Sequence, residues 1–169
     1  KQFLAILCSG ISIKLLDDFL DKELDEVSGQ YNTAIIFGDR IIVYALLFLA
    51  GGATLAPFIT LPLFFASYIV GMFDKMGNVY PSQLNGYQES VLVGILAVTI
   101  WGWNITAFSL SLMAAVQLFD DVIDVKKDNW TGINNYAQRY GVVECILTGI
   151  LLLIIAWWFF ASALTPSLL

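Results

Sequence analysis

The sequence contains no histidine among its 169 residues, and only 13% of the residues are charged. The missing histidine excludes His-ligated zinc or haem sites, Ser-His-Asp triads and Cys-His dyads. The low charge argues against an ordinary soluble domain, because such domains carry about 25% charged residues. Cys8 and Cys145 are far apart and lack CxxC spacing, so the sequence predicts neither a disulfide framework nor a cysteine metal site.

Hydrophobic residues make up 59% of the chain and are grouped in long blocks, with a mean hydropathy of +0.78. A membrane helix needs about 20 apolar residues, so the uncharged blocks 41–73 and 90–119 are each too long for one helix. Gly51-Gly52 with Pro57 predicts a turn in the first block, and Gly102 with Asn104 predicts one in the second. We therefore predict an all-α polytopic membrane bundle of six helices, at approximately 2–20, 33–53, 57–74, 88–103, 104–125 and 136–163. The alternative is a single long helix over 88–125.

The charges sort by side if six helices alternate in direction. Seven of the eight basic residues, and both acid-rich windows, then emerge on one membrane face, and only Lys1 lies on the other. The positive-inside rule makes the charged face cytoplasmic. The five-helix alternative places the acid-rich windows on opposite faces, so this sorting favours six helices in an integral membrane protein.

Ten of the 14 acidic residues fall into two windows, 17–26 and 120–128. Shifting the sequence by 103 residues aligns 17–38 with 120–141, with eight of 22 positions identical. Such internal similarity predicts one membrane domain built from two repeat halves, approximately 1–87 and 88–169. The identical pairs are Asp17/Asp120, Asp18/Asp121, Asp21/Asp124, Asp25/Asp128, Gly29/Gly132, Asn32/Asn135, Ala34/Ala137 and Gly38/Gly141.

Each copy of the repeat carries the pattern DDxxDxxxD. Helical spacing places Asp18, Asp21 and Asp25 along one helix face, and their equivalents Asp121, Asp124 and Asp128 along another. Carboxylates at this spacing repel one another, and a divalent cation relieves the repulsion. Mg²⁺ suits all-oxygen ligands and is bound through one or two carboxylates together with substrate phosphates. A single acidic window is typical of a solvated helix end, but two windows in the same register favour a site in which facing stripes hold Mg²⁺ and a diphosphate.

At these residues the chain resembles the UbiA-type intramembrane prenyltransferases, whose two aspartate-rich motifs end two membrane helices. The resemblance implies transfer of a polyprenyl group from its diphosphate to a small lipophilic acceptor, such as a quinone, lipid or pigment precursor. It implies that Asp18, Asp21, Asp121 and Asp124 are catalytic, with the prenyl tail among the helices and no nucleic acid as a partner. The Mg²⁺ ligands that it implies are Asp17, Asp18, Asp21, Asp25, Asp121, Asp124 and Asp128.

Basic and amide side chains near the motifs are candidates for contact with diphosphate, since the charge on the leaving group must be stabilised. Asn32 and Asn135 follow the two stripes at matched positions and either bind phosphate or cap the next helix, and capping is the favoured role. Tyr44 and Tyr68 are candidates for stabilising a carbocation. The basic candidates, which are alternatively membrane anchors, are Lys22, Lys126, Lys127 and Arg139.

The members of this family are longer chains, so the resemblance implies a short or truncated member. The length motivates a rival hypothesis: a non-catalytic lipid-, quinone- or pigment-associated subunit of a larger membrane complex. An ion carrier with two acidic repeats is a third hypothesis, and it ranks last because the stripes lie at helix ends.

Overall fold

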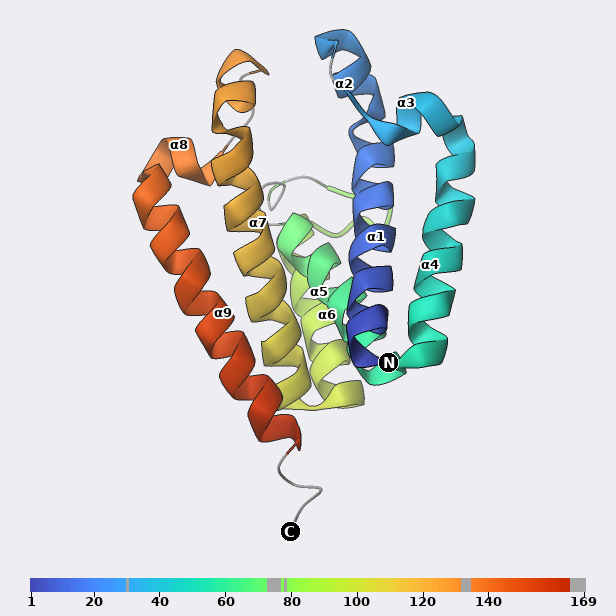
Figure 1. The fold of residues 1–169 in the computed structure, drawn as a ribbon, viewed down its shortest axis with the longest axis vertical. Coiled ribbons are helices and arrows are strands. Elements are labelled where there is room, and N and C mark those ends of the chain that lie inside the picture. The colour runs from blue at the N-terminus through green and yellow to red at the C-terminus, as the bar shows by residue number, and fades with distance from the viewer. Residues whose placement is uncertain (30, 73–76, 78, 132–134, 165–169) are drawn as a thin grey trace. The chain divides into compact units, whose positions relative to one another are not determined.

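The computed structural model describes residues 1–29, 31–72, 77, 79–131 and 135–164, and within these ranges all side chains except those of residues 24, 28, 126–131 and 164. The described chain is all-helical apart from loops and one isolated bridge between Val79 and Asn85 (Figure 1). The elements in chain order are α1 (Gln2–Leu20), α2 (Lys22–Ser28), α3 (Thr33–Phe37), the 3-10 turn η1 (Gly38–Arg40), α4 (Ile41–Leu55), α5 (Pro57–Gly71), α6 (Gly86–Trp101), α7 (Trp103–Thr131), α8 (Tyr136–Tyr140) and α9 (Val142–Leu164).

Both predicted helix breaks are present in the described residues, but the first lies after Gly51-Gly52 rather than at these glycines. α4 continues through Gly51-Gly52 and ends at Leu55, and Pro57 begins α5, as expected from its fixed φ and missing N–H. Gly102 adopts a φ of 80° between α6 and α7, a conformation that costs glycine little. The alternative of one helix over 88–125 is therefore wrong.

Two predicted helices are each interrupted near their start. The segment 33–53 begins with α3 and η1 before α4, and 136–163 begins with α8 before α9. Gly38 and Gly141 lie at the interruptions with φ of 59° and 106°, values that L side chains rarely adopt. The hydrophobic pattern did not predict these breaks, because the segments before and after each glycine are both helical.

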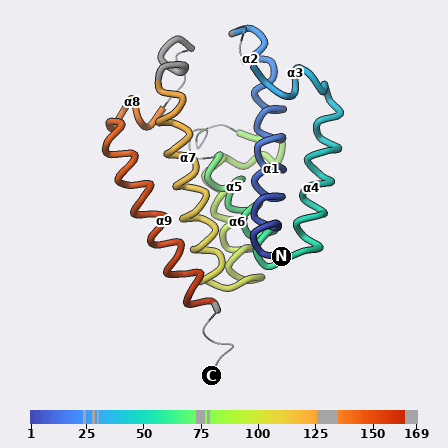
Figure 2. Tube along the Cα trace, viewed as in Figure 1, coloured from blue at the N-terminus to red at the C-terminus, as the bar shows by residue number. Residues whose placement is uncertain are grey.

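The chain divides into two compact units, residues 1–64 and 65–169. In the first unit, α1 packs against α4 (Figure 2). Small buried residues line these helices, including Ala5 and Ser9 of α1 and Ala45 and Gly52 of α4. Small side chains allow membrane helices to approach closely.

Gly52 is a point of close approach in the first unit. A Cβ atom at this position would lie 3.0 Å from the side chain of Thr60 and 3.2 Å from the Cβ of Cys8. The neighbouring Gly51 would meet nothing within 4 Å. Of these two neighbouring glycines, only Gly52 is therefore required by packing.

In the second unit, α7 packs along α9. Ala115, Cys145 and Ala156 are buried in these helices, and a Cβ at Gly149 would lie 2.8 Å from the Phe119 ring. α6 also packs on α7. Phe65 of α5 contacts Trp101 of α6 in an edge-to-face arrangement, with 4.9 Å between the ring centroids.

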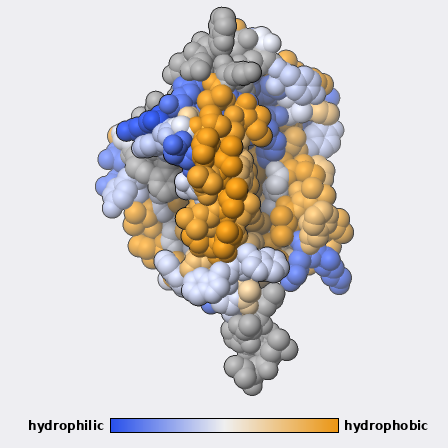
Figure 3. Space-filling view, turned by 60° about the vertical axis from the view of Figure 1, so that its left-hand side comes forward, coloured by the Kyte–Doolittle hydropathy of each residue, from blue (hydrophilic) through white to orange (hydrophobic). Residues whose placement is uncertain are grey.

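Within the part of the chain that the structure describes, three stretches of helix are long and apolar enough to cross a membrane: Thr33–Leu55, Trp103–Val125 and Val142–Ala163. Large apolar side chains of α9 are exposed, among them Leu147, Ile154 and Trp157. Figure 3 shows a continuous band of hydrophobic side chains on one face of the molecule. A band of this kind suits lipid rather than water, so the structure is that of an all-α helical membrane protein.

Candidate functional site

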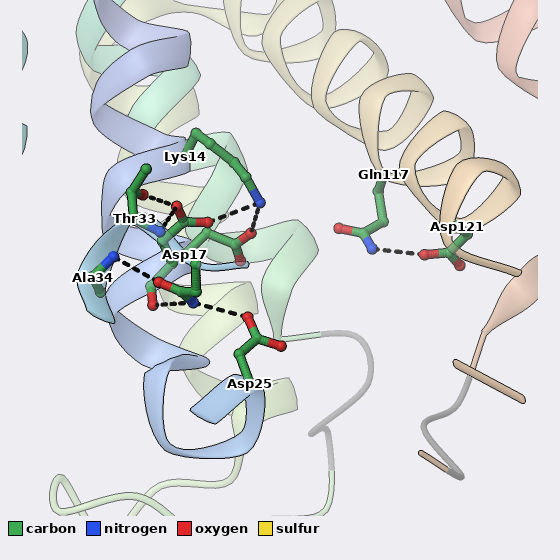
Figure 4. Close-up of polar contacts among 9 residues, drawn as sticks. Lys14, Asp17, Asp25, Thr33, Ala34, Gln117 and Asp121 are labelled. Atoms are coloured by element: carbon green, nitrogen blue, oxygen red, sulfur yellow. Dashed lines mark hydrogen bonds and ion pairs between the residues drawn. The ribbon is translucent and has the colours of Figure 1, made fainter. Parts of the chain in front are cut away.

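The first aspartate motif spans the junction of α1 with α2 and is tied to the segment that leads into α3. Asn32, which is buried, caps α3 by accepting a hydrogen bond from Ala34 N at 2.6 Å. Its Nδ2 donates to the backbone oxygen of Asp18 and to Oδ2 of Asp25, both at 2.8 Å. One amide therefore fixes the end of α1, the buried carboxylate of α2 and the start of α3 (Figure 4).

Asp18 is the central carboxylate of this arrangement. Its Oδ2 accepts hydrogen bonds from the backbone N of Thr33, at 3.3 Å, and from the Thr33 hydroxyl. Its Oδ1 lies 3.1 Å from Nζ of Lys14, which is also 3.2 Å from Oδ2 of Asp17. Asp18 is thus held from both sides, and its side chain is only 12% exposed.

The second motif repeats this arrangement 103 residues later. Asn135 is buried and caps α8 by accepting from Ala137 N at 2.8 Å and Gln138 N at 3.2 Å. Its Nδ2 donates to the backbone oxygen of Asp121 at 2.8 Å. The carboxylate of Asp121 accepts from Tyr136 N at 2.8 Å through Oδ2 and from Gln117 Nε2 at 3.0 Å through Oδ1.

The identical residues of the sequence repeat therefore make the same contacts in each unit. In both, an asparagine caps a short helix and donates to the backbone oxygen 14 residues earlier, while the carboxylate at that earlier residue accepts from the first N–H of the short helix. The favoured capping role of Asn32 and Asn135 is confirmed. Their contact with diphosphate stays a prediction, and it would require the caps to rearrange.

The remaining predicted ligands lie in different surroundings. Asp21 is exposed between α1 and α2, Asp25 is 7% exposed, and Asp124 is half-buried in α7. In the first unit, Asp18 and Asp25 thus turn toward Asn32 and its connector, whereas Asp21 faces outward. The side chain of Asp128 lies outside the described residues.

The predicted basic contacts are only partly placed. Lys22 pairs with Asp39 at 3.2 Å, and the guanidinium of Arg139 lies over the ring of Tyr140 at 5.3 Å from its centroid. Both residues are near a motif in sequence, but each is engaged by a neighbour of its own unit. The side chains of Lys126 and Lys127 lie outside the described residues.

The tyrosines proposed to stabilise a cation have separate contacts. Tyr44 is exposed on α4 and meets Phe37 edge-on, with 5.6 Å between ring centroids. Tyr68 donates its hydroxyl to Glu89, which also accepts from Ser82. Glu89 thereby links α5, the following loop and α6 within the second unit.

Among the described residues, no group of three or more acidic, cysteine or histidine side chains converges on one point. A Mg²⁺ ion does not need such a cage, because it retains waters and is held by one or two carboxylates with substrate phosphates. Asp17 and Asp18 supply two adjacent carboxylates, and the Asp17 side chain is 50% exposed. The donor set of the first motif therefore fits Mg²⁺ chemically.

Sequence reasoning missed two residues at the motifs. Lys14 and Gln117 lie one helical turn before Asp18 and Asp121, and each donates to the Oδ1 atom of its aspartate. The signal that could have identified them is their register, because they are also separated by 103 residues.

No protein-family model, curated protein or solved structure matches the chain.

Proposed function

We propose that the chain is a Mg²⁺-dependent intramembrane prenyltransferase of the UbiA type, which transfers a polyprenyl group from its diphosphate to a small lipophilic acceptor. The observation that carries the proposal is the recurrence of two aspartate motifs in one register, each attached to its helix connector by the same hydrogen bonds. A solvated acidic helix end has no need of a buried asparagine that holds its backbone in place.

The proposal places six helices across the membrane: α1, α4, α5, α6, α7 and α9. α5 and α6 contain 15 and 16 residues, which corresponds to about 23 Å of helix, so they cross by local thinning of the bilayer or with help from flanking residues. The motifs then face the cytoplasm, since most basic residues emerge on that side. The exposed apolar faces of α4 and α9 contact lipid and the prenyl tail.

In this proposal the carboxylates Asp17, Asp18 and Asp21 of the first motif and Asp121, Asp124 and Asp128 of the second hold Mg²⁺. When bound, Mg²⁺ supplies charge neutralisation for a diphosphate leaving group. The contribution of the chain is positional: the backbone N–H groups of Thr33 and Tyr136 donate to the carboxylates of Asp18 and Asp121 and fix them before any ligand arrives. Fixed carboxylates keep the ligand geometry within the narrow range that an enzyme site requires.

The test is transfer from a labelled prenyl diphosphate by the full chain in lipid nanodiscs, with and without Mg²⁺. Asp18→Asn and Asp121→Asn should each abolish Mg²⁺-dependent transfer. Thr33→Val is the matched control, because it removes the hydroxyl that donates to Asp18 but leaves the carboxylate charge. It should retain most of the activity. Full activity in both asparagine variants would refute the proposal.

A second candidate is a non-catalytic lipid-, quinone- or pigment-associated subunit of a larger membrane complex. It is favoured by the engagement of both asparagines and both central aspartates in local hydrogen bonds, which gives these residues a role in folding without catalysis. Co-purification with another membrane complex at fixed stoichiometry, without turnover of any prenyl diphosphate, would support this candidate and contradict the enzyme.

A further inference from the structure

The position one helical turn before each motif carries a different side chain in the two units. In the second unit it is Gln117, whose neutral amide donates to Oδ1 of Asp121 at 3.0 Å. In the first unit it is Lys14, whose ammonium lies 3.1 Å from Oδ1 of Asp18 and 3.2 Å from Oδ2 of Asp17. The equivalent oxygen therefore receives a neutral donor in one motif and a positive charge in the other.

The ammonium of Lys14 occupies the position that a bound cation would take between two neighbouring carboxylates. Asp17 and Asp18 are adjacent in sequence, and Lys14 reaches both because it lies three and four residues earlier on the same helix. The Lys14 side chain is 64% exposed, so its four-carbon stem can carry the charge away without disturbing a packed core. Asp18 stays in place when Lys14 leaves, because Thr33 holds its other oxygen.

We propose that Lys14 is a tethered counter-cation of the first motif, which competes with a divalent cation for the Asp17–Asp18 pair. This inference rests on the Mg²⁺ dependence of the proposed function and adds the control of cation affinity by one residue. A divalent ion that binds the pair must displace the ammonium, and the ammonium repels that ion while it remains nearby. Gln117, at the equivalent position, accommodates an incoming cation without this repulsion.

The simpler reading is a surface ion pair with little effect, since exposed pairs contribute little to stability. The two readings differ in what they predict for metal binding. An incidental ion pair leaves the affinity for a divalent ion nearly unchanged when Lys14 is replaced. A competing counter-cation lowers that affinity until it is removed.

The first test measures binding of Mn²⁺, used as a paramagnetic substitute for Mg²⁺, to the full chain in nanodiscs of neutral lipid. Free Mn²⁺ is followed by electron paramagnetic resonance. Lys14→Gln, which copies the second motif, should bind Mn²⁺ about tenfold more tightly, as expected for removing one charge near a divalent site. Lys14→Arg keeps the charge and should bind like the wild type, and Gln117→Lys should weaken binding.

The outcomes separate the inference from the proposed function. Mn²⁺ binding that changes less than about twofold in Lys14→Gln overturns the competition and leaves the magnesium site intact. No Mn²⁺ binding in either the wild type or Lys14→Gln, with both chains folded by circular dichroism, overturns the magnesium site and the inference together.

A second readout reports on Lys14 directly in the unmodified chain. Acylation of its amine by an N-hydroxysuccinimide ester, quantified by peptide mass spectrometry, should accelerate several-fold when Mg²⁺ is added. Lys1 serves as the internal control and should not respond. Asp17→Asn removes one carboxylate of the pair and should abolish the acceleration, whereas an equal response of Lys1 and Lys14 contradicts the inference.

Discussion

Replacing Asn32 by alanine should destabilise the chain by about 2–4 kcal/mol, because this amide makes three hydrogen bonds in a buried position. The variant loses the cap on Ala34 N, which is worth about 1 kcal/mol. It also removes a donor from the backbone oxygen of Asp18 and from the carboxylate of Asp25, at about 1 kcal/mol or more for each buried acceptor. For a chain of this length, the loss corresponds to a fall in Tm of about 5–12 °C.

The assay is unfolding in detergent micelles by titration with a denaturing detergent, followed by circular dichroism, with Tm measured in parallel. Asn32→Asp is the informative companion variant, because it keeps the cap acceptor but sets a second carboxylate against Asp25. It should be at least as unstable as Asn32→Ala at neutral pH. Its deficit should shrink as the pH falls, since protonating one carboxylate removes the repulsion and restores a donor.

Asn135→Ala tests whether the same logic holds in the second unit, and it should lose a similar amount of stability. A loss below about 0.5 kcal/mol in both alanine variants would refute the reasoning, because the bonds would then have no net value over hydration. Loss in only one unit would show that the two connectors, despite equal hydrogen bonds, differ in how much they contribute to folding.

Two further predictions use glycines. Gly51→Ala should raise Tm, because the new Cβ would enter open space and alanine is the better helix former by about 1 kcal/mol. Gly52→Ala should lower Tm, because its Cβ would crowd Thr60 and Cys8. The test is whether the two variants shift Tm in opposite directions in matched melting curves. Gly102→Ala should cost about 1–2 kcal/mol through backbone strain alone, since φ is 80° and no atom lies within 4 Å of its Cβ, and an unchanged unfolding free energy would contradict this.

The positions of the long helices could be predicted from sequence because length and hydrophobicity set them. The breaks near Pro57 and Gly102 could also be predicted, because proline and glycine are the strongest local signals for the end of a helix. The end of α7 was not visible. A helix does not stop where its hydrophobic stretch ends, and α7 continues to Thr131 through the second motif.

The capping of α3 and α8 could also be anticipated, since asparagine before a short helical segment is a strong N-terminal signal. What the caps hold was not predictable. The contact of Asn32 with Asp18 crosses 14 residues and depends on how α2 and the connector return to α1. The helix propensities of single residues do not show that the connector folds back against the end of α1.

The sequence by itself determined that this protein is helical and apolar, where its long helices lie, and that two aspartate motifs share one register. These properties depend on composition and on spacing along a single helix. Only the tertiary structure decided that Asp18 and Asp121 are fixed by the N-termini of the short helices that follow them. The reason is physical: a hydrogen bond between separate helices exists only where the folded chain brings the two atoms within about 3 Å, and spacing along one helix does not set that distance.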